Sequence, residues 1–379
     1  MIRQYKEVCQ KDQNVILDNY VLKNGVYFKL DINKPIEQIG EDEFLIVNNR
    51  EDNVSKPELY KWFKVRDYYS GVLNDDMNKA IDLPAKKIHS TNYLTLFIKK
   101  DVFPNSGDKK ALTIDDLRKR IEGYFNALEK GEEKFLEIYV GSNYTKSRLT
   151  REEKEEFLQT YFKSEVEYIR STNRVDAIKR HKQYLLDRLC EIVAFVNKFS
   201  DKHEFSNYIK IFFNQDINIY EKESKIYTIP RIFNVNDYNL FTNQGILGLP
   251  SNNITTNSKK PFLLLRTMQC HVPFRSSAID VEVTKNFLTW LKKQDYKGIK
   301  LDYDYKFDGT PTHKRENAYF NVHIDQSGVI DDFDNIPFDV PKLEFKFENV
   351  LLMTKKSEDG INRIVLPTEI IDDFGFMSI

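Results

Sequence analysis

The first part of the chain alternates short apolar runs with polar turns, as β-strands in a mixed α/β region do. Apolar, β-forming runs lie on both sides of Asn24 and Gly25, and an Asn-Gly pair in that setting predicts a β-hairpin with a type I′ turn. A further strand is predicted at 44–47, whereas 93–98 fits either a strand or the core of a helix. We assign residues 1–112 to this N-terminal α/β region.

Residues 113–225 change to the spacing of amphipathic helices. Thr113 and Thr150 each precede acidic residues in the manner of a capping box, which predicts that helices begin there. The polar segment 171–173 is expected to interrupt the helices. Beyond it, six apolar residues share one helical face, which we interpret as packing against neighbouring helices: Tyr184, Leu185, Leu189, Ile192, Val193 and Val196.

From residue 226 to 379 the pattern is mixed again. A strand is predicted at 226–229, a helix at 278–291, and half-exposed strands at 302–307 and 343–348. The sequence therefore predicts an α+β fold, in which mixed β-sheet regions flank a central helical region. The third region is assigned to 226–379.

The composition is that of an ordinary globular protein, with 41% hydrophobic and 30% charged residues. No apolar run approaches the ~20 residues that a membrane span needs, and the first residues lack the apolar stretch of a secretory signal. Cys9, Cys190 and Cys270 are far apart and form no C-x-x-C pair, which argues against a disulfide framework or a cysteine zinc site. We expect a cytoplasmic protein without a membrane partner.

The formal net charge of −1 argues against a lone protein that coats DNA nonspecifically, since such proteins are usually basic. Its distribution is uneven, however, because no Asp or Glu occurs from Tyr238 to Ile279, although the chain has 58 acidic residues in 379. This stretch is rich in amides and hydroxyls. Phosphates repel carboxylates and accept hydrogen bonds from such donors, and amides are suited to base edges. The loop 242–260 is therefore a candidate nucleic-acid contact, the alternative being an ordinary Asn-rich loop.

A second segment without acidic residues runs from Leu83 to Lys100. By contrast, 325–348 contains seven acidic residues, and we expect it to face solvent or a basic protein partner. Such a segregation would reconcile a neutral chain with one basic binding face.

The sequence contains neither the G-x-x-x-x-G-K-[ST] phosphate loop nor the G-x-G-x-x-G fingerprint, so nucleotide hydrolysis and hydride transfer have no support. One metal-binding alternative exists. Asp302 and Asp304 share a face of a predicted strand, as do His323 and Asp325, and these groups could hold divalent ions for phosphodiester cleavage. Half-solvated strands show the same alternation, so we predict no metal site, no cofactor and no catalytic residue, with a nuclease as the alternative.

Two parts of the chain resemble blocks found in the large subunit of type I-B CRISPR interference (Cascade) complexes. Their order and rough separation fit that family as well. The first part comprises 67–70 (DYYS), 78–82 (NKAID) and 86–94 (KKIHSTNYL), and the second 260–267 (KPFLLLRT), 272–274 (VPF) and 287–291 (FLTWL).

The resemblance implies a binding subunit without a catalytic centre. The family's large subunit lies beside the 5′ handle of the CRISPR RNA, together with the backbone and small subunits of Cascade. It recognises the protospacer-adjacent motif on double-stranded target DNA and presents the site to a recruited helicase-nuclease, while guide pairing reads the remaining sequence.

Under this interpretation two groups of residues are expected to contact nucleic acid. The group expected at RNA or DNA phosphates is Lys79, Lys86, Lys87, His89 and Asn92. For His89 and Asn92 the equal alternative is that they cap or pin a buried turn. The group expected to read the motif and anchor the adjacent backbone is Asn243, Gln244, Asn252, Asn253, Lys259 and Lys260.

The family's large subunits are usually longer and end in a helical bundle, whereas this sequence stops at Ile379 after its α+β body. We expect either a fragment or a naturally short subunit, and we carry over no function of the bundle. A scaffold that touches only protein is a further alternative.

Overall fold

The computed structural model describes the chain in segments. The described residues are 17, 20–48, 56–71, 87–140, 150–229, 233, 236–243, 245–249, 275–291, 299–302, 319–324, 330–336, 354–356, 358 and 362–364. Among them, no helix is both long and apolar enough to cross a membrane.

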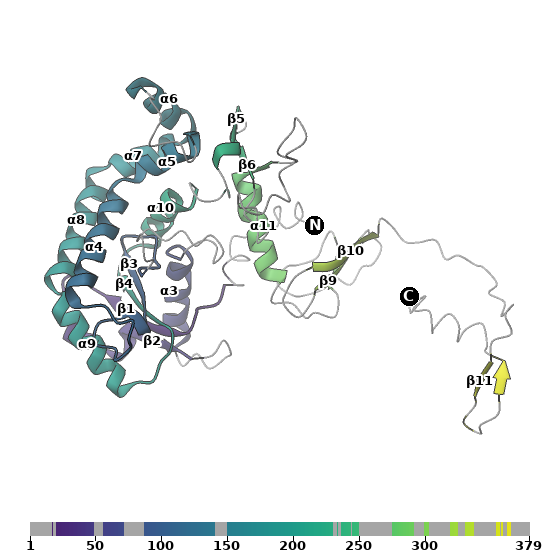
Figure 1. Cartoon of the computed structure of the whole chain (residues 1–379), viewed down its shortest axis with the longest axis horizontal. Coiled ribbons are helices and arrows are strands. Elements are labelled where there is room, and N and C mark those ends of the chain that lie inside the picture. The colour runs from purple at the N-terminus through teal and green to yellow at the C-terminus, as the bar shows by residue number, and fades with distance from the viewer. Residues whose placement is uncertain are drawn as a thin grey trace.

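A four-stranded mixed sheet lies among the helices of the first part of the chain (Figure 1). Its strands are β1 (Gly25–Leu30), β2 (Phe44–Val47), β3 (Thr95–Lys99) and β4 (Tyr208–Phe213), in the order β2-β1-β4-β3. β1 and β4 are parallel, and the other two pairs are antiparallel. The strand predicted at 44–47 is confirmed, and the ambiguous run 93–98 contains β3.

Helices cover both faces of this sheet, which explains why its strands are nearly continuous apolar runs. On one face, α3 (Pro57–Tyr68) packs Phe63 against Tyr27 and Phe212. On the other face, helices α8 (Thr172–Asp187) and α9 (Leu189–Lys202) pack aromatic rings against the strands, as Phe199 does against Phe28.

The helical layer begins where the sequence predicted. Thr113 accepts a hydrogen bond from the backbone N–H of Asp116 and caps α4 (Ile114–Glu129), while Thr150 and Glu153 form a capping box at α6 (Arg151–Tyr161). Ser171 separates α7 (Lys163–Arg170) from α8, which confirms the predicted interruption. The remaining helices of this body are α5 (Gly131–Val140) and α10 (Ile217–Thr228), and the 3-10 helices are Ile36–Gln38, Glu41–Glu43, Lys100–Val102 and Asn236–Tyr238.

The predicted division between 1–112 and 113–225 is not a boundary between folding units. β4 lies within the supposed helical region, yet it occupies the middle of the sheet between β1 and β3. One hydrophobic core accordingly runs from Leu22 to Tyr227. The strand predicted at 226–229 is also wrong, because this apolar run belongs to the end of α10.

The predicted hairpin at Asn24 and Gly25 is wrong too. Gly25 is the first residue of β1, whose hydrogen-bonded neighbours are β2 and β4. A Cβ added at Gly25 would lie 2.5 Å from the carbonyl oxygen of Tyr208. The glycine therefore permits a close approach between parallel strands, and not a tight turn.

A smaller antiparallel sheet follows, with β6 (Gly245–Gly248) between β5 (Leu240–Thr242) and β7 (Ser276–Ser277). β7 leads directly into α11 (Ala278–Leu291), which confirms the helix predicted there. Ser277 caps this helix by accepting the backbone N–H of Asp280 at 3.1 Å.

The described strands beyond α11 form two further antiparallel sheets. β9 (Tyr319–Ile324) pairs with both β8 (Ile299–Asp302) and β10 (Ile330–Ile336). β11 (Thr354–Lys356) pairs with β12 (Asn362–Ile364). Of the strand predicted at 302–307, only Asp302 is described, and 343–348 lies outside the described residues. The helices and mixed sheets together confirm the α+β class.

Candidate nucleic-acid interface

The structure describes four of the eleven predicted contact residues, namely Lys87, His89, Asn92 and Asn243. The other seven lie outside the described residues: Lys79, Lys86, Gln244, Asn252, Asn253, Lys259 and Lys260. The four that can be placed fall in three different environments.

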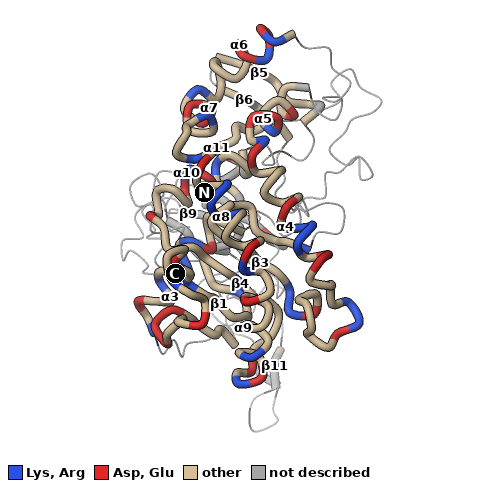
Figure 2. Tube along the Cα trace, turned by 90° about the vertical axis from the view of Figure 1, so that its left-hand side faces the viewer, with Lys and Arg blue, Asp and Glu red and all other residues tan. Residues whose placement is uncertain are grey.

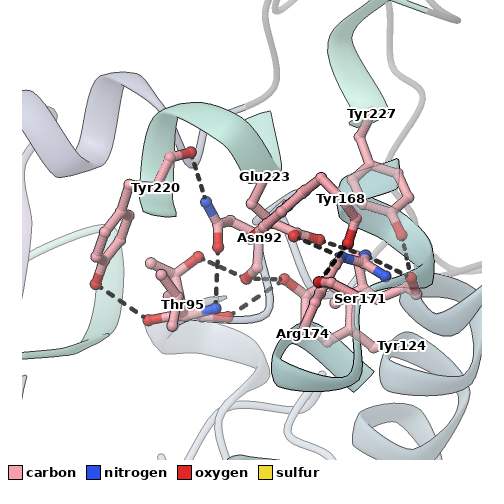
Figure 3. Close-up of polar contacts among 11 residues, drawn as sticks. Asn92, Thr95, Tyr124, Tyr168, Ser171, Arg174, Tyr220, Glu223 and Tyr227 are labelled. Atoms are coloured by element: carbon pink, nitrogen blue, oxygen red, sulfur yellow. Dashed lines mark hydrogen bonds and ion pairs between the residues drawn. The ribbon is translucent and has the colours of Figure 1, made fainter. Parts of the chain in front are cut away.

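Asn92 is part of the protein core and is fully buried. Its Oδ1 accepts the backbone N–H of Leu94 at 3.0 Å, and its Nδ2 donates to the carbonyl of Tyr220 at 3.1 Å (Figure 3). Both ends of the amide are thus used in joining the turn before β3 to α10. The expectation that Asn92 contacts phosphate is wrong in this structure, and the alternative of a pinned, buried turn is confirmed for this residue.

A buried ion pair lies near Asn92 and adds to the polar character of this region (Figure 3). Nη2 and Nε of Arg174 donate to the two carboxylate oxygens of Glu223 at 2.6 and 2.9 Å. Burial alone would lower the pKa of Arg174, but the adjacent Glu223 carboxylate outweighs it, so the pKa is raised. Arg174 also donates to the Leu128 carbonyl at 3.0 Å. These contacts bind α8, α10 and α4 together, and we interpret them as structural.

Lys87 and His89 lie on the outer side of β3, at the edge of the four-stranded sheet. The antiparallel bridge between Ile88 and Ile98 brings Lys87 beside Lys99. The ring of His89 lies 5.5 Å from the ring of Tyr208, which pairs with Lys99 in the sheet. Tyr208 was not among the predicted contact residues, because its neighbours in space lie more than a hundred residues earlier in the chain.

This edge combines half-buried cations with an aromatic ring. Lys87, His89, Lys99 and Tyr208 all retain partial exposure. Cations suit phosphates, and an aromatic ring offers a surface on which a base stacks. The backbone N–H of His89 donates to Phe97 at 2.9 Å, so this residue pins the chain to β3 while its ring remains at the surface.

Asn243 occupies the turn of the β5–β6 hairpin and is exposed. The pairing of Thr242 with Gly245 leaves only Asn243 and Gln244 between the two strands. The hairpin, residues 240–248, contains no charged residue, whereas Lys, Arg, Asp and Glu are interspersed along the helices around it (Figure 2). It lies within the acid-free stretch 238–279.

The hairpin is held firmly against the helical layer. Phe241 contacts the rings of Tyr139 and Phe157, with centroids 5.5 and 5.3 Å apart. Nδ2 of Asn239 donates to the carbonyl of Ile138 at 3.2 Å, and Nε of Arg275 donates to the carbonyl of Tyr238 at 2.8 Å. These contacts come from α5, α6 and the residue before β7, so the turn is presented from a fixed base.

The alternative metal site receives no support from the residues that can be placed. Asp302 pairs with Tyr319, four residues along β9 from His323. This separation corresponds to about 13 Å along a strand, too far for one ion. Asp304 and Asp325 lie outside the described residues. Among the described residues, no three His, Cys, Asp or Glu side chains gather as a metal site would require.

Comparisons with known proteins add no relative to this picture. No family model, no curated protein and no solved structure matches the chain.

Proposed function

We propose that this chain is a non-catalytic nucleic-acid-recognition subunit of a CRISPR RNA-guided surveillance complex. In this role it recognises the protospacer-adjacent motif of double-stranded target DNA, contacts the 5′ handle of the CRISPR RNA and helps to recruit the helicase-nuclease. The blocks at 67–94 and 260–291 resemble the type I-B large subunit. The observation that carries the proposal is the uncharged β5–β6 hairpin with Asn243 exposed at its turn.

The chemistry of this hairpin suits motif reading. An amide side chain both donates and accepts hydrogen bonds, so it distinguishes the edges of different base pairs. A carboxylate nearby would be repelled by the phosphates that flank those bases. The hairpin has none, and its aromatic base on α5 and α6 limits the displacement of the turn.

The edge formed by Lys87, His89, Lys99 and Tyr208 supports a second part of the proposal. It offers cations and a ring to a nucleic-acid backbone without base-specific groups. We assign this edge to positioning contacts and the hairpin to the motif.

The test compares duplexes with and without a candidate flanking motif. The full chain is reconstituted with guide RNA and the Cascade backbone subunits, and magnesium is present so that binding and cleavage are scored in the same samples. The wild-type assembly is expected to prefer the motif duplex and to leave it uncut. Asn243→Ala is expected to reduce this preference about tenfold, the scale of one lost base contact. Asn173→Ala, an exposed Asn on α8, is the matched control and should change nothing.

Each other outcome contradicts the proposal in a specific way. Cleavage that disappears in Asp304→Ala would make the chain a metal-dependent nuclease. An assembly that forms but gains no motif preference from this chain would leave a scaffold that touches only protein. Equal effects of Asn243→Ala and Asn173→Ala would remove the hairpin from the interface.

A further inference from the structure

A hollow of about 470 Å³ opens where β3 ends and β4 begins. Lys99, Lys100 and Asp101 line it from one segment, and Ser106 and Asp108 from the loop that follows. Its remaining wall is the segment 205–207, which leads into β4. A hollow of this size is in the range that holds small molecules of roughly nucleotide dimensions, about 300–1,000 Å³.

The basic part of the wall consists of Lys99 and Lys100. Nζ of Lys100 donates to the carbonyl of Phe205 at 3.0 Å and lies 4.3 Å from the centre of its ring. Among the described residues, neither Lys99 nor Lys100 forms an ion pair with a carboxylate. Asn207 adds an exposed amide beside them. Ammonium and amide groups together are suited to a phosphate.

The acidic part of the wall has a different chemistry. Asp101 is partly neutralised by Lys110, whose Nζ lies 3.5 Å from Oδ2, yet its side chain remains 35% exposed. Asp108 accepts the backbone N–H of Lys110 at 2.9 Å and is also exposed. Two carboxylates would repel a ligand that is only anionic. They would instead accept hydrogen bonds from hydroxyl groups, as an acidic residue does from the ribose of a bound nucleotide.

The backbone around the hollow is held in an unusual conformation. Asn105 and Asn207 are the two non-glycine residues of the described chain with positive φ, at 60° and 72°. Asn207 lines the hollow and Asn105 precedes the lining residue Ser106. The carbonyl of Asn207 accepts the backbone N–H of Lys100 at 2.8 Å, which ties the two walls to each other.

We infer that this hollow binds one ribonucleotide, with its phosphate at Lys99 and its ribose hydroxyls at Asp101. A phosphate alone would use only the basic wall, and a deoxyribonucleotide would lack the 2′-hydroxyl that separates RNA from DNA at a protein site. The nucleotide could be free or part of an RNA strand, because both present the same phosphate and ribose. The hollow is distinct from the β5–β6 hairpin but shares Lys99 with the edge proposed for positioning contacts. Motif preference, which tests the hairpin, and ribonucleotide binding, which tests the hollow, therefore fail independently.

The test is a set of calorimetric titrations of the full chain. Adenosine 5′-monophosphate, its 2′-deoxy counterpart and inorganic phosphate are compared, followed by an adenine RNA octamer and the DNA octamer of the same sequence. Saturable binding of the ribonucleotide is expected, with about tenfold weaker binding of the deoxy form, since it loses a hydrogen bond to a charged group. Tighter binding of the RNA octamer than of the monophosphate would identify a strand as the source, and the reverse a free nucleotide.

Two variants and one control separate the walls of the hollow. Lys99→Ala should weaken the binding of the ribonucleotide and of its deoxy form alike, by about tenfold, because both lose the cation at the phosphate. Asp101→Asn should mainly reduce the difference in affinity between the ribonucleotide and the deoxyribonucleotide. Lys61→Ala, an exposed Lys on α3, is the charge-matched control and should leave both affinities unchanged.

The inference is overturned if neither ribonucleotide nor RNA binds saturably while the variants keep the wild-type melting temperature. It is also overturned if inorganic phosphate competes as well as the ribonucleotide, or if Lys61→Ala weakens binding as much as Lys99→Ala. Duplex binding through the motif is measured on the same preparations and reports the hairpin separately.

Discussion

At the scale of single residues, Asn92 is expected to matter for stability and not for binding. Asn92→Ala leaves the Leu94 N–H and the Tyr220 carbonyl without this partner inside the core. We expect a loss of about 2–4 kcal/mol in the free energy of unfolding, measured by urea denaturation. Asn173→Ala, on the surface, should stay within about 0.5 kcal/mol of wild type. Weaker RNA binding with unchanged stability would instead make Asn92 a contact residue.

His181 carries a second residue-scale prediction, on pH. Its Nδ1 faces the carbonyl of Ala177 at 2.7 Å, so Nδ1 carries the proton of the neutral ring, and Nε2 is buried without a partner among the described residues. Burial lowers the pKa of His181 to about 4. The unfolded chain, with a His pKa of about 6.5, therefore binds the proton more readily than the folded chain does.

The sign of the effect follows from this difference in pKa. The contribution of His181 is fully present above pH ~6.5 and is lost as the pH falls towards ~4, at about 1.4 kcal/mol per pH unit. Unfolding free energies measured between those values should therefore decline less in His181→Phe, which keeps a ring between Tyr93 and Phe213. Parallel curves for the two proteins would show that His181 does not titrate in this range.

At the scale of secondary-structure elements, replacing either of two glycines with alanine should change the stability of the protein, but in opposite directions. At Gly25, a Cβ would meet the Tyr208 carbonyl oxygen at 2.5 Å, so Gly25→Ala should separate β1 from β4 and cost about 1–3 kcal/mol. At Gly123, in α4, a Cβ meets nothing within 4 Å, and Gly123→Ala should stabilise the helix by about 0.5–1 kcal/mol. Thermal melts of the two variants check the signs, and a tolerated alanine at Gly25 would contradict the strand register.

The secondary-structure elements differ in how well the sequence predicts them. Signals within a few residues succeeded, since the caps at Thr113 and Thr150 mark real helix starts. Signals that depend on distant partners failed. Gly25 looks like a turn residue until Tyr208 is placed beside it, and the apolar residues at 226–229 look like a strand until the core that α10 completes is known.

The residues of the candidate site also divide into those marked by nearby sequence and those that depend on distant partners. The absence of acidic residues was visible along the sequence, and it drew attention to the segment that contains the exposed Asn243. For Asn92 the sequence left a phosphate contact and a pinned, buried turn equally open, because its partner Tyr220 lies 128 residues away. The grouping of Lys87, Lys99 and Tyr208 could not be predicted, because only the sheet pairing reveals it.

At the scale of the whole molecule, buried charges join segments that were predicted to lie in separate regions, 1–112 and 113–225. Nζ of Lys210 in β4 lies 2.5 Å from Oδ1 of Asp67 in α3, and the hydroxyl of Tyr20 donates to the other oxygen of Asp67 at 2.6 Å. Breaking such a buried pair costs more than making it gains, because one charge remains uncompensated. α3 and β4 therefore belong to one cooperative unit despite the 143 residues between Asp67 and Lys210.

This arrangement predicts how fragments of the chain behave. Residues 1–112 alone lack β4, the strand between β1 and β3, and we expect no cooperative unfolding transition from them. Residues 1–229 contain the complete core, from Leu22 to Tyr227, and should unfold in one step.

Trp62 is the single tryptophan of that longer fragment, and its ring lies 6.3 Å from Phe212 in β4. Its fluorescence therefore reports the packing of α3 on the sheet, while circular dichroism reports the helices. Coincident transitions would establish one unit, and separate ones would restore a domain boundary near residue 112.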